Sequence, residues 1–202
     1  MGVLLGVLTP LRLFNDVVLA VCRFLAATAL AFMVVFILTQ VFFRYVLNSA
    51  LPWPDEAARF AMLWMTGLMA PTAYRRGGFV AIDMMARALP RAVARVLTFA
   101  LLLVCTVVIW EALKIGWSEV TGFAGTFKTA SLYTVFFPSI SDMTIEFGYG
   151  KMPRSHMMAS LVVGLALMLV VSVELILRAI IDFLGGGAQL PPLDAADMAG
   201  AE

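Results

Sequence analysis

The side chains best able to take part in chemistry gather at the start of the second hydrophobic stretch. Asp55, Glu56 and Arg59 directly follow Pro54. Proline suits the first position of a helix, where its missing N–H has no helical partner, and the two acids complement the positive end of the helix dipole. Asp55 and Arg59 are four residues apart, the spacing of an ion pair on one helix face. These charges therefore serve either the helix itself or a buried polar contact with another protein.

Two tryptophans flank this charged group. Trp53 precedes it, and Trp64 follows five residues after Arg59. Tryptophan is enriched where a membrane meets water, because its ring is apolar and its N–H is polar. Two interpretations stay open for both residues: anchoring at the lipid interface, and contact with another subunit.

Two consecutive arginines, Arg75 and Arg76, end the same stretch. Basic residues at a membrane edge bind anionic headgroups and orient the chain, at about 1 kcal/mol per residue. A contact with the cytoplasmic side of a partner protein is the alternative. Beyond them, Asp83 and Arg87 lie four residues apart on the polar side of a short amphipathic pattern, Val80–Leu89.

The side chains needed for redox or metal chemistry are few. His156 is the single histidine, so the chain by itself cannot form a bis-histidine haem site or an ordinary zinc site. Cys22 and Cys105 fall within apolar stretches and suit packing. No nucleophile turn or phosphate-binding glycine loop is present. We therefore expect no enzyme activity, no metal and no cofactor.

Charge-free runs place these residues in a membrane. The first run, Phe24–Phe43, is 20 residues long and reaches about 30 Å as a helix, the hydrocarbon thickness of a bilayer. Shorter runs follow at Phe60–Tyr74, Val96–Trp110 and Met157–Val173. Only 13% of the residues are charged, against roughly 25% in soluble domains. The sequence predicts an all-α integral membrane protein with four transmembrane helices.

The expected organisation is a single four-span membrane domain over residues 1–184. The spans cover about 17–43, 54–74, 92–114 and 155–177. Val80–Leu89, between spans two and three, has the pattern of a short amphipathic interfacial helix. Residues 185–202 are rich in Gly, Pro, Ala and Asp, a composition that predicts a flexible cytoplasmic tail.

The longest connection, Gly116–Met152, is not uniformly polar. Its segment Thr129–Ser141 contains no charge but has only 13 residues, too few to cross a bilayer. We expect this segment to be re-entrant, interfacial or covered by protein.

Orientation follows from the arginines. The connection between spans two and three holds the densest basic cluster of the chain, and cytoplasmic loops carry such an excess. With four spans, both termini are then cytoplasmic as well. The net charge is close to zero, so composition offers no argument for nucleic acid.

The block Arg44–Pro90 resembles the small membrane subunit of the tripartite ATP-independent periplasmic (TRAP) transporters. The pattern joins an Arg-Tyr at the end of span one, a Pro-Trp followed by acids and Ala-Arg-aromatic, an Arg-rich turn, and a later Asp and Leu-Pro. The matching residues are Arg44, Tyr45, Pro52, Trp53, Asp55, Glu56, Ala58, Arg59, Trp64, Arg75, Arg76, Gly77, Gly78, Asp83, Leu89 and Pro90. Phe79 stands where the family usually has a histidine, so a polar contact made there is absent or replaced.

The resemblance implies a non-catalytic small permease subunit in a bacterial inner membrane. In such systems a periplasmic solute-binding protein delivers an organic acid, a dicarboxylate or related carboxylate, to a large membrane subunit that moves it inward with sodium. The small subunit packs against the large one and supports it. Its partners are thus the large subunit, the binding protein and membrane lipids.

Candidate site residues follow from the same block. Those expected at a partner interface are Arg44, Tyr45, Trp53, Asp55, Glu56, Arg59 and Trp64. Those expected to contact headgroups or a partner on the cytoplasmic side are Arg75, Arg76, Asp83 and Arg87. The alternatives are a self-sufficient four-span channel or carrier, a structural subunit of another membrane complex, and a membrane-embedded enzyme or electron carrier.

Overall fold

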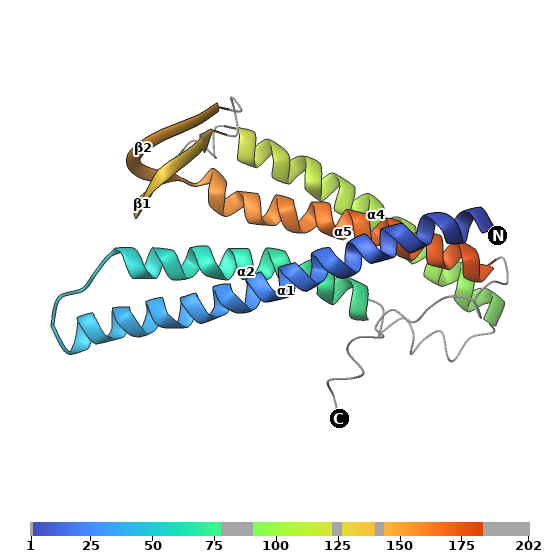
Figure 1. The fold of residues 1–202 in the computed structure, drawn as a ribbon, viewed down its shortest axis with the longest axis horizontal. Helices are drawn as coiled ribbons and strands as arrows, with labels where there is room; N and C mark the ends of the chain where they lie inside the picture. The colour runs from blue at the N-terminus through green and yellow to red at the C-terminus, as the bar shows by residue number, and fades with distance from the viewer. Residues whose placement is uncertain (1, 78–90, 123–126, 140–143, 184–202) are drawn as a thin grey trace. The chain divides into compact units, whose positions relative to one another are not determined.

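The computed structural model describes residues 2–77, 91–122, 127–139 and 144–183. Within them four helices and one β-hairpin follow in chain order (Figure 1). The elements are α1 (Gly2–Tyr45), α2 (Trp53–Gly77), α4 (Arg91–Thr121), β1 (Lys128–Ser139), β2 (Thr144–Pro153) and α5 (Ser155–Phe183). The predicted interfacial helix and the predicted tail lie outside the described residues.

Three of the described helices are long and apolar enough to cross a membrane. They correspond to Leu8–Tyr45 in α1, Val93–Thr121 in α4 and Ser155–Phe183 in α5. The prediction of an apolar helical membrane protein is therefore confirmed at this level. Helix α2 occupies the place of the predicted second span, but it is not among these three.

Two prolines lie inside helices instead of ending them. Helix α1 begins at Gly2 and continues through Pro10, so it starts well before the expected boundary near residue 17. Helix α2 continues through Pro71 to Gly77, although a proline inside a helix often kinks or ends it. A proline inside a helix removes one helical hydrogen bond, and Pro71 is fully buried in the fold.

Residues in the first and last turns of α2 explain where this helix begins and ends. Trp53 and Pro54 begin the helix, with Asp55 and Glu56 in its first turn, and the two arginines lie in its last turn. This charge order complements the helix dipole. The turn before α2 contains Asn48 at a φ of 48°, a left-handed conformation that asparagine adopts more readily than most residues.

The long connection contains a β-hairpin. Strands β1 and β2 pair antiparallel, with Tyr133 opposite Lys151 and Ser139 opposite Thr144, and the register shifts twice along the ladder. An antiparallel pair satisfies backbone groups that a helix would otherwise satisfy, so a segment too short to span can still form regular structure. The structure therefore contains a β-hairpin in addition to helices, which are the elements that the sequence predicts.

The chain forms two compact units. The first comprises residues 1–20, 70–110 and 166–202, and its described part has a core of Leu19, Leu102, Val171 and Leu175. The partly buried Tyr74, Ile176 and Ala179 pack against this core.

The second unit comprises residues 21–69 and 111–165. Its helices α2 and α5 approach closely at Gly67 and Gly164: a Cβ built on either glycine would collide with backbone of the opposite helix. Small residues at such a crossing let two helix backbones meet, as is common in membrane bundles.

Candidate functional site

In the second unit, Glu56 joins the start of α2 to the hairpin. Its carboxylate accepts hydrogen bonds from the backbone N–H groups of Ala130 (3.1 Å), Ser131 (2.7 Å) and Leu132 (3.1 Å). The Ser131 hydroxyl also donates to Glu56 at 2.5 Å, and its oxygen lies 3.1 Å from the carbonyl oxygen of Pro52. Bonds to an ionised acceptor are the strong ones in proteins. Glu56 therefore holds the first residues of β1 against the beginning of α2.

The neighbouring charges face outward. Asp55 and Arg59 form the predicted i,i+4 ion pair, with 3.1 Å between Oδ2 and Nη2. Their side chains are 61% and 74% exposed, so the pair itself stabilises the chain by little. Both remain available to a protein that covers this face of α2.

The two tryptophans of α2 also have partners inside the unit. The ring of Trp53 meets Phe36 edge to face, with 6.0 Å between ring centroids. The indole N–H of Trp64 donates to the carbonyl oxygen of His156 at 3.2 Å, which ties α2 to the start of α5. Trp53 is still 40% exposed.

The end of α1 is exposed. The guanidinium of Arg44 lies 5.9 Å from the centroid of the adjacent Tyr45 ring, and that ring is 72% exposed. The structure thus brings Trp53, Asp55 and Arg59 to the start of α2, directly after the turn that follows Arg44 and Tyr45.

One face of α2 in this unit is exposed along its length. Pro54, Ala57, Ala58, Ala61 and Leu68 are buried, at the helical spacing of one packed side. The opposite side presents an exposed stripe, made of Asp55, Arg59, Met62, Leu63, Thr66 and Met69. We refer to these six residues as the α2 stripe. It combines an ion pair with large apolar side chains.

In the first unit, a buried charged cluster joins α1, α2 and α5. Glu174, with no exposed side-chain surface, accepts hydrogen bonds from Asn15 (2.7 Å), Arg75 (2.9 Å) and Arg178 (2.9 and 3.0 Å). Arg75 also donates to Asp16 at 2.5 Å. A charge in a low-dielectric interior is tolerated only when it is paired and hydrogen-bonded, and both Glu174 oxygens have such donors.

Two further polar contacts lie at the edge of this cluster. Arg12 lies 3.5 Å from Asp16, and the hydroxyls of Ser172 and Tyr74 lie 3.1 Å apart on α5 and α2. Because the partners come from three helices, the cluster fixes how these helices are rotated about their axes. The cluster therefore serves to hold the three helices together, since each carboxylate is already bound by arginine.

The spacing of Glu174 and Arg178, four residues apart, by itself suggests only a local pair on one helix. The structure corrects this: the pair is buried and includes Arg75 from another helix. The signal was present in the sequence, because Glu174 interrupts an apolar run from Met157 to Leu177. A carboxylate at such a place needs a cation from elsewhere in the fold.

The predicted cytoplasmic contact residues fall into three groups. The Arg75 guanidinium donates within the chain and is 6% exposed. Arg76 is exposed at the end of α2. Asp83 and Arg87 lie outside the described residues. The headgroup and partner contacts of this set stay predictions.

No group of three or more His, Cys, Asp or Glu side chains suited to a metal ion occurs in the part of the chain that the structure describes. The comparison with curated proteins gives no match. The family model described as "Tripartite ATP-independent periplasmic transporters, DctQ component" matches residues 33–182, about three quarters of the chain. That range includes both ends of α2, the hairpin and the Glu174 end of α5. The chain therefore belongs to the DctQ family, the small component of TRAP transporters.

Proposed function

We propose that this protein is the small permease subunit of a sodium-coupled, binding-protein-dependent importer of organic acids. In this proposal the chain packs against the large transport subunit and supports it, while solute capture and translocation belong to other polypeptides. Family membership supports the transporter role. The α2 stripe is the observation that supports packing against a partner.

The argument from α2 rests on its composition and length. Its 25 residues reach about 37 Å, enough to cross the hydrocarbon core of about 30 Å. It is nevertheless less apolar than the three candidate spans, with Asp55, Glu56, Arg59, Arg75 and Arg76 near its ends. Polar side chains of a membrane helix face protein or water in preference to lipid. We therefore take α2 as the fourth span and its stripe as the surface that another protein covers.

The hydrogen bonding of two carboxylates in the described helices also favours a supporting role for this chain beside the large subunit. The buried carboxylate of Glu174 and the Glu56 carboxylate are engaged by donors of the chain itself. A solute or sodium ion moving through this chain alone would have to displace those donors. We place the transport pathway in the large subunit for that reason.

The orientation proposed for the chain follows the positive-inside rule. Arg75, Arg76, Arg87, Arg91 and Arg95 bracket the connection after α2, which we assign to the cytoplasm of a bacterial cell. Four spans then put both termini on the same side, facing the cytoplasm.

Site-specific cross-linking tests the partner surface. A photoreactive leucine analogue is placed at residue 69, which is 41% exposed on the stripe, or at residue 68, which is 8% exposed on the packed side. In cells that express the neighbouring reading frames, residue 69 should cross-link to a much larger polytopic protein. Residue 68 serves as the matched control and should cross-link only within the chain. Cross-links to lipid alone at residue 69 would contradict the proposal.

Reconstitution tests the transport role. Vesicles with this chain, its co-purified large subunit and the binding protein should take up a carboxylate only with an inward sodium gradient. Vesicles with this chain alone should show no uptake. Flux through the lone chain would favour the self-sufficient channel or carrier instead.

A further inference from the structure

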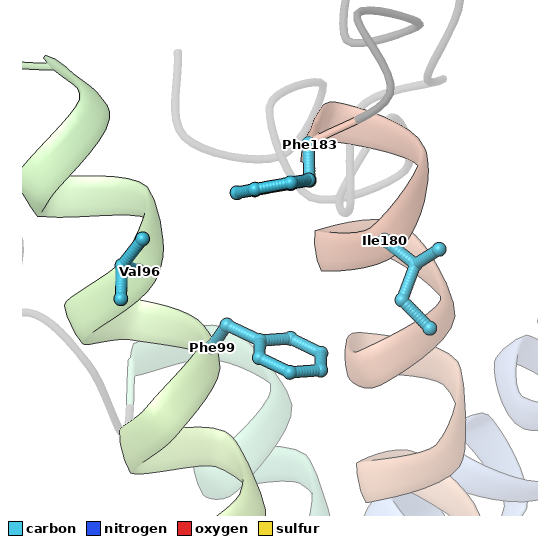
Figure 2. A pocket seen from close by; sticks show the side chains of 4 residues that line it. All are labelled: Val96, Phe99, Ile180 and Phe183. Atoms are coloured by element: carbon cyan, nitrogen blue, oxygen red, sulfur yellow. The ribbon is translucent and has the colours of Figure 1, made fainter.

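A small apolar cavity lies between α4 and α5 in the first unit. Its volume is about 360 Å³, and its lining is Val96, Phe99, Ile180 and Phe183. Figure 2 shows the rings of Phe99 and Phe183 extending from their helices into the space between them. No polar surface contributes to the lining. The cavity therefore offers a ligand dispersion contacts and exclusion of water, with no hydrogen bond.

The position of the cavity selects the kind of ligand. Val96 lies near the first turn of α4, and Phe183 is the last residue of α5. Both helices are candidate membrane spans, so we place these residues at the edge of the membrane. Val96 and Phe183 are 57% and 62% exposed. An apolar opening at that depth meets lipid acyl chains before it meets any soluble molecule.

Two opposite charges stand beside the cavity. Arg95 precedes Val96 and Asp182 precedes Phe183, and 3.3 Å separates Nε of the arginine from Oδ2 of the aspartate. Their side chains are 45% and 44% exposed, so each can bind a further charged group. A headgroup with both a phosphate and a primary ammonium complements this pair. A purely anionic headgroup would be repelled by the Asp182 carboxylate.

We propose that this site binds one zwitterionic phospholipid of the ethanolamine class. An acyl chain fills the cavity, the phosphate pairs with Arg95, and the ammonium pairs with Asp182. The four charges then alternate in sign around the headgroup. The proposal stands apart from the transport function, and either can fail without the other.

Native mass spectrometry of the delipidated full-length chain tests acyl-chain binding. Phosphatidylethanolamine, phosphatidylcholine and phosphatidylglycerol are added separately as probes. We expect one phosphatidylethanolamine per chain, bound at least tenfold more tightly than phosphatidylglycerol. Val96→Trp fills the cavity and should weaken this binding at least tenfold. Val107→Trp is the matched control, because Val107 is also on α4 and is 60% exposed. Equal binding by both variants would overturn the proposal.

Headgroup variants test the charge pair. Asp182→Asn should abolish the preference for phosphatidylethanolamine over phosphatidylglycerol while one lipid is still bound, because the cavity is intact. Arg95→Gln should weaken all three probes. Unchanged thermal midpoints for the variants show that folding is intact. If Asp182→Asn keeps the preference, the assignment of the ammonium is wrong.

A cysteine at the cavity distinguishes lipid from protein as its occupant. In the delipidated chain, Val96→Cys should react with a membrane-soluble maleimide, and added phosphatidylethanolamine should slow the reaction. If Val96→Cys is unreactive with and without lipid, another part of the protein fills the cavity and the proposal is wrong.

Discussion

The guanidinium of Arg75 and the carboxylate of Glu174 lie 2.9 Å apart, with 6% and 0% of their side chains exposed. They come from α2 and α5, almost a hundred residues apart in the chain. Both residues sit where sequence patterns alone suggest local roles: topology for the arginine and neutralisation of a neighbour for the glutamate. Together with Asn15, Asp16 and Arg178 they form the polar centre of the first unit.

Removing the charge of Glu174 should destabilise the protein strongly. In Glu174→Gln, Arg75 and Arg178 stay buried without their shared anion, and breaking a buried pair costs about 3–5 kcal/mol. Unfolding in detergent by increasing amounts of dodecyl sulfate measures the change. Glu111→Gln is the matched control: its pair with Lys114 is more than half exposed, so the loss should stay below about 1 kcal/mol. Similar losses in the two variants would contradict the burial of the Glu174 charge.

Arg75 and Glu174 should be energetically coupled. Because the two side chains bond directly, the double variant Arg75→Gln/Glu174→Gln should be more stable than the sum of the single losses predicts, by about 0.5–3 kcal/mol. A double-mutant cycle on the same unfolding assay gives this value. Arg59→Gln combined with Glu174→Gln should be additive, since the Arg59 side chain is exposed and pairs with Asp55. Strict additivity for Arg75 and Glu174 would show that their contact has no energetic consequence.

Replacing Glu56 by Gln should loosen the beginning of β1. A neutral amide accepts the N–H groups of Ala130, Ser131 and Leu132 less strongly than a carboxylate, and a bond to a charged group contributes about 1.5–3 kcal/mol. Amide hydrogen exchange at these three residues should accelerate at least tenfold, since about 1.4 kcal/mol corresponds to tenfold. Asp55→Asn, one residue away and paired only with Arg59 in the contacts described, should leave exchange there unchanged. Unaltered exchange in Glu56→Gln would rule out this anchoring role.

Small side chains should be required where α2 crosses α5 in the second unit. A methyl group at Gly164 would lie 2.5 Å from the carbonyl oxygen of Gly67, so Gly164→Ala forces the helices apart. Overpacking of this kind typically costs about 1–3 kcal/mol. Gly6→Ala is the control: nothing lies within 4 Å of its Cβ, and alanine favours the helix. Thermal unfolding in mild detergent should show a lower midpoint for Gly164→Ala and no decrease for Gly6→Ala. The reverse order would mean that the helices do not cross at these glycines.

The sequence by itself determined the membrane class, the order of the helices and the family. Long charge-free runs have a direct physical cause in the cost of placing charge in hydrocarbon, and the block from Arg44 to Pro90 carries a resemblance that the family match then confirmed. The start of α2 could also be predicted from the sequence, because Pro54, Asp55 and Glu56 act through local backbone and dipole effects. The Asp55–Arg59 and Glu111–Lys114 pairs follow from spacing on one helix.

Only the tertiary structure decided which charges are buried and what they bind. Nothing in spacing joins Glu174 to Arg75 and Asn15, or Glu56 to the backbone of Ser131, because such pairs depend on how distant helices and strands are placed. The hairpin and the continuation of α1 through Pro10 were missed for a related reason: strand pairing and packing around a proline are set by residues far away in the chain. Periodicity reports what a segment prefers when alone, whereas burial depends on what the rest of the fold brings against it.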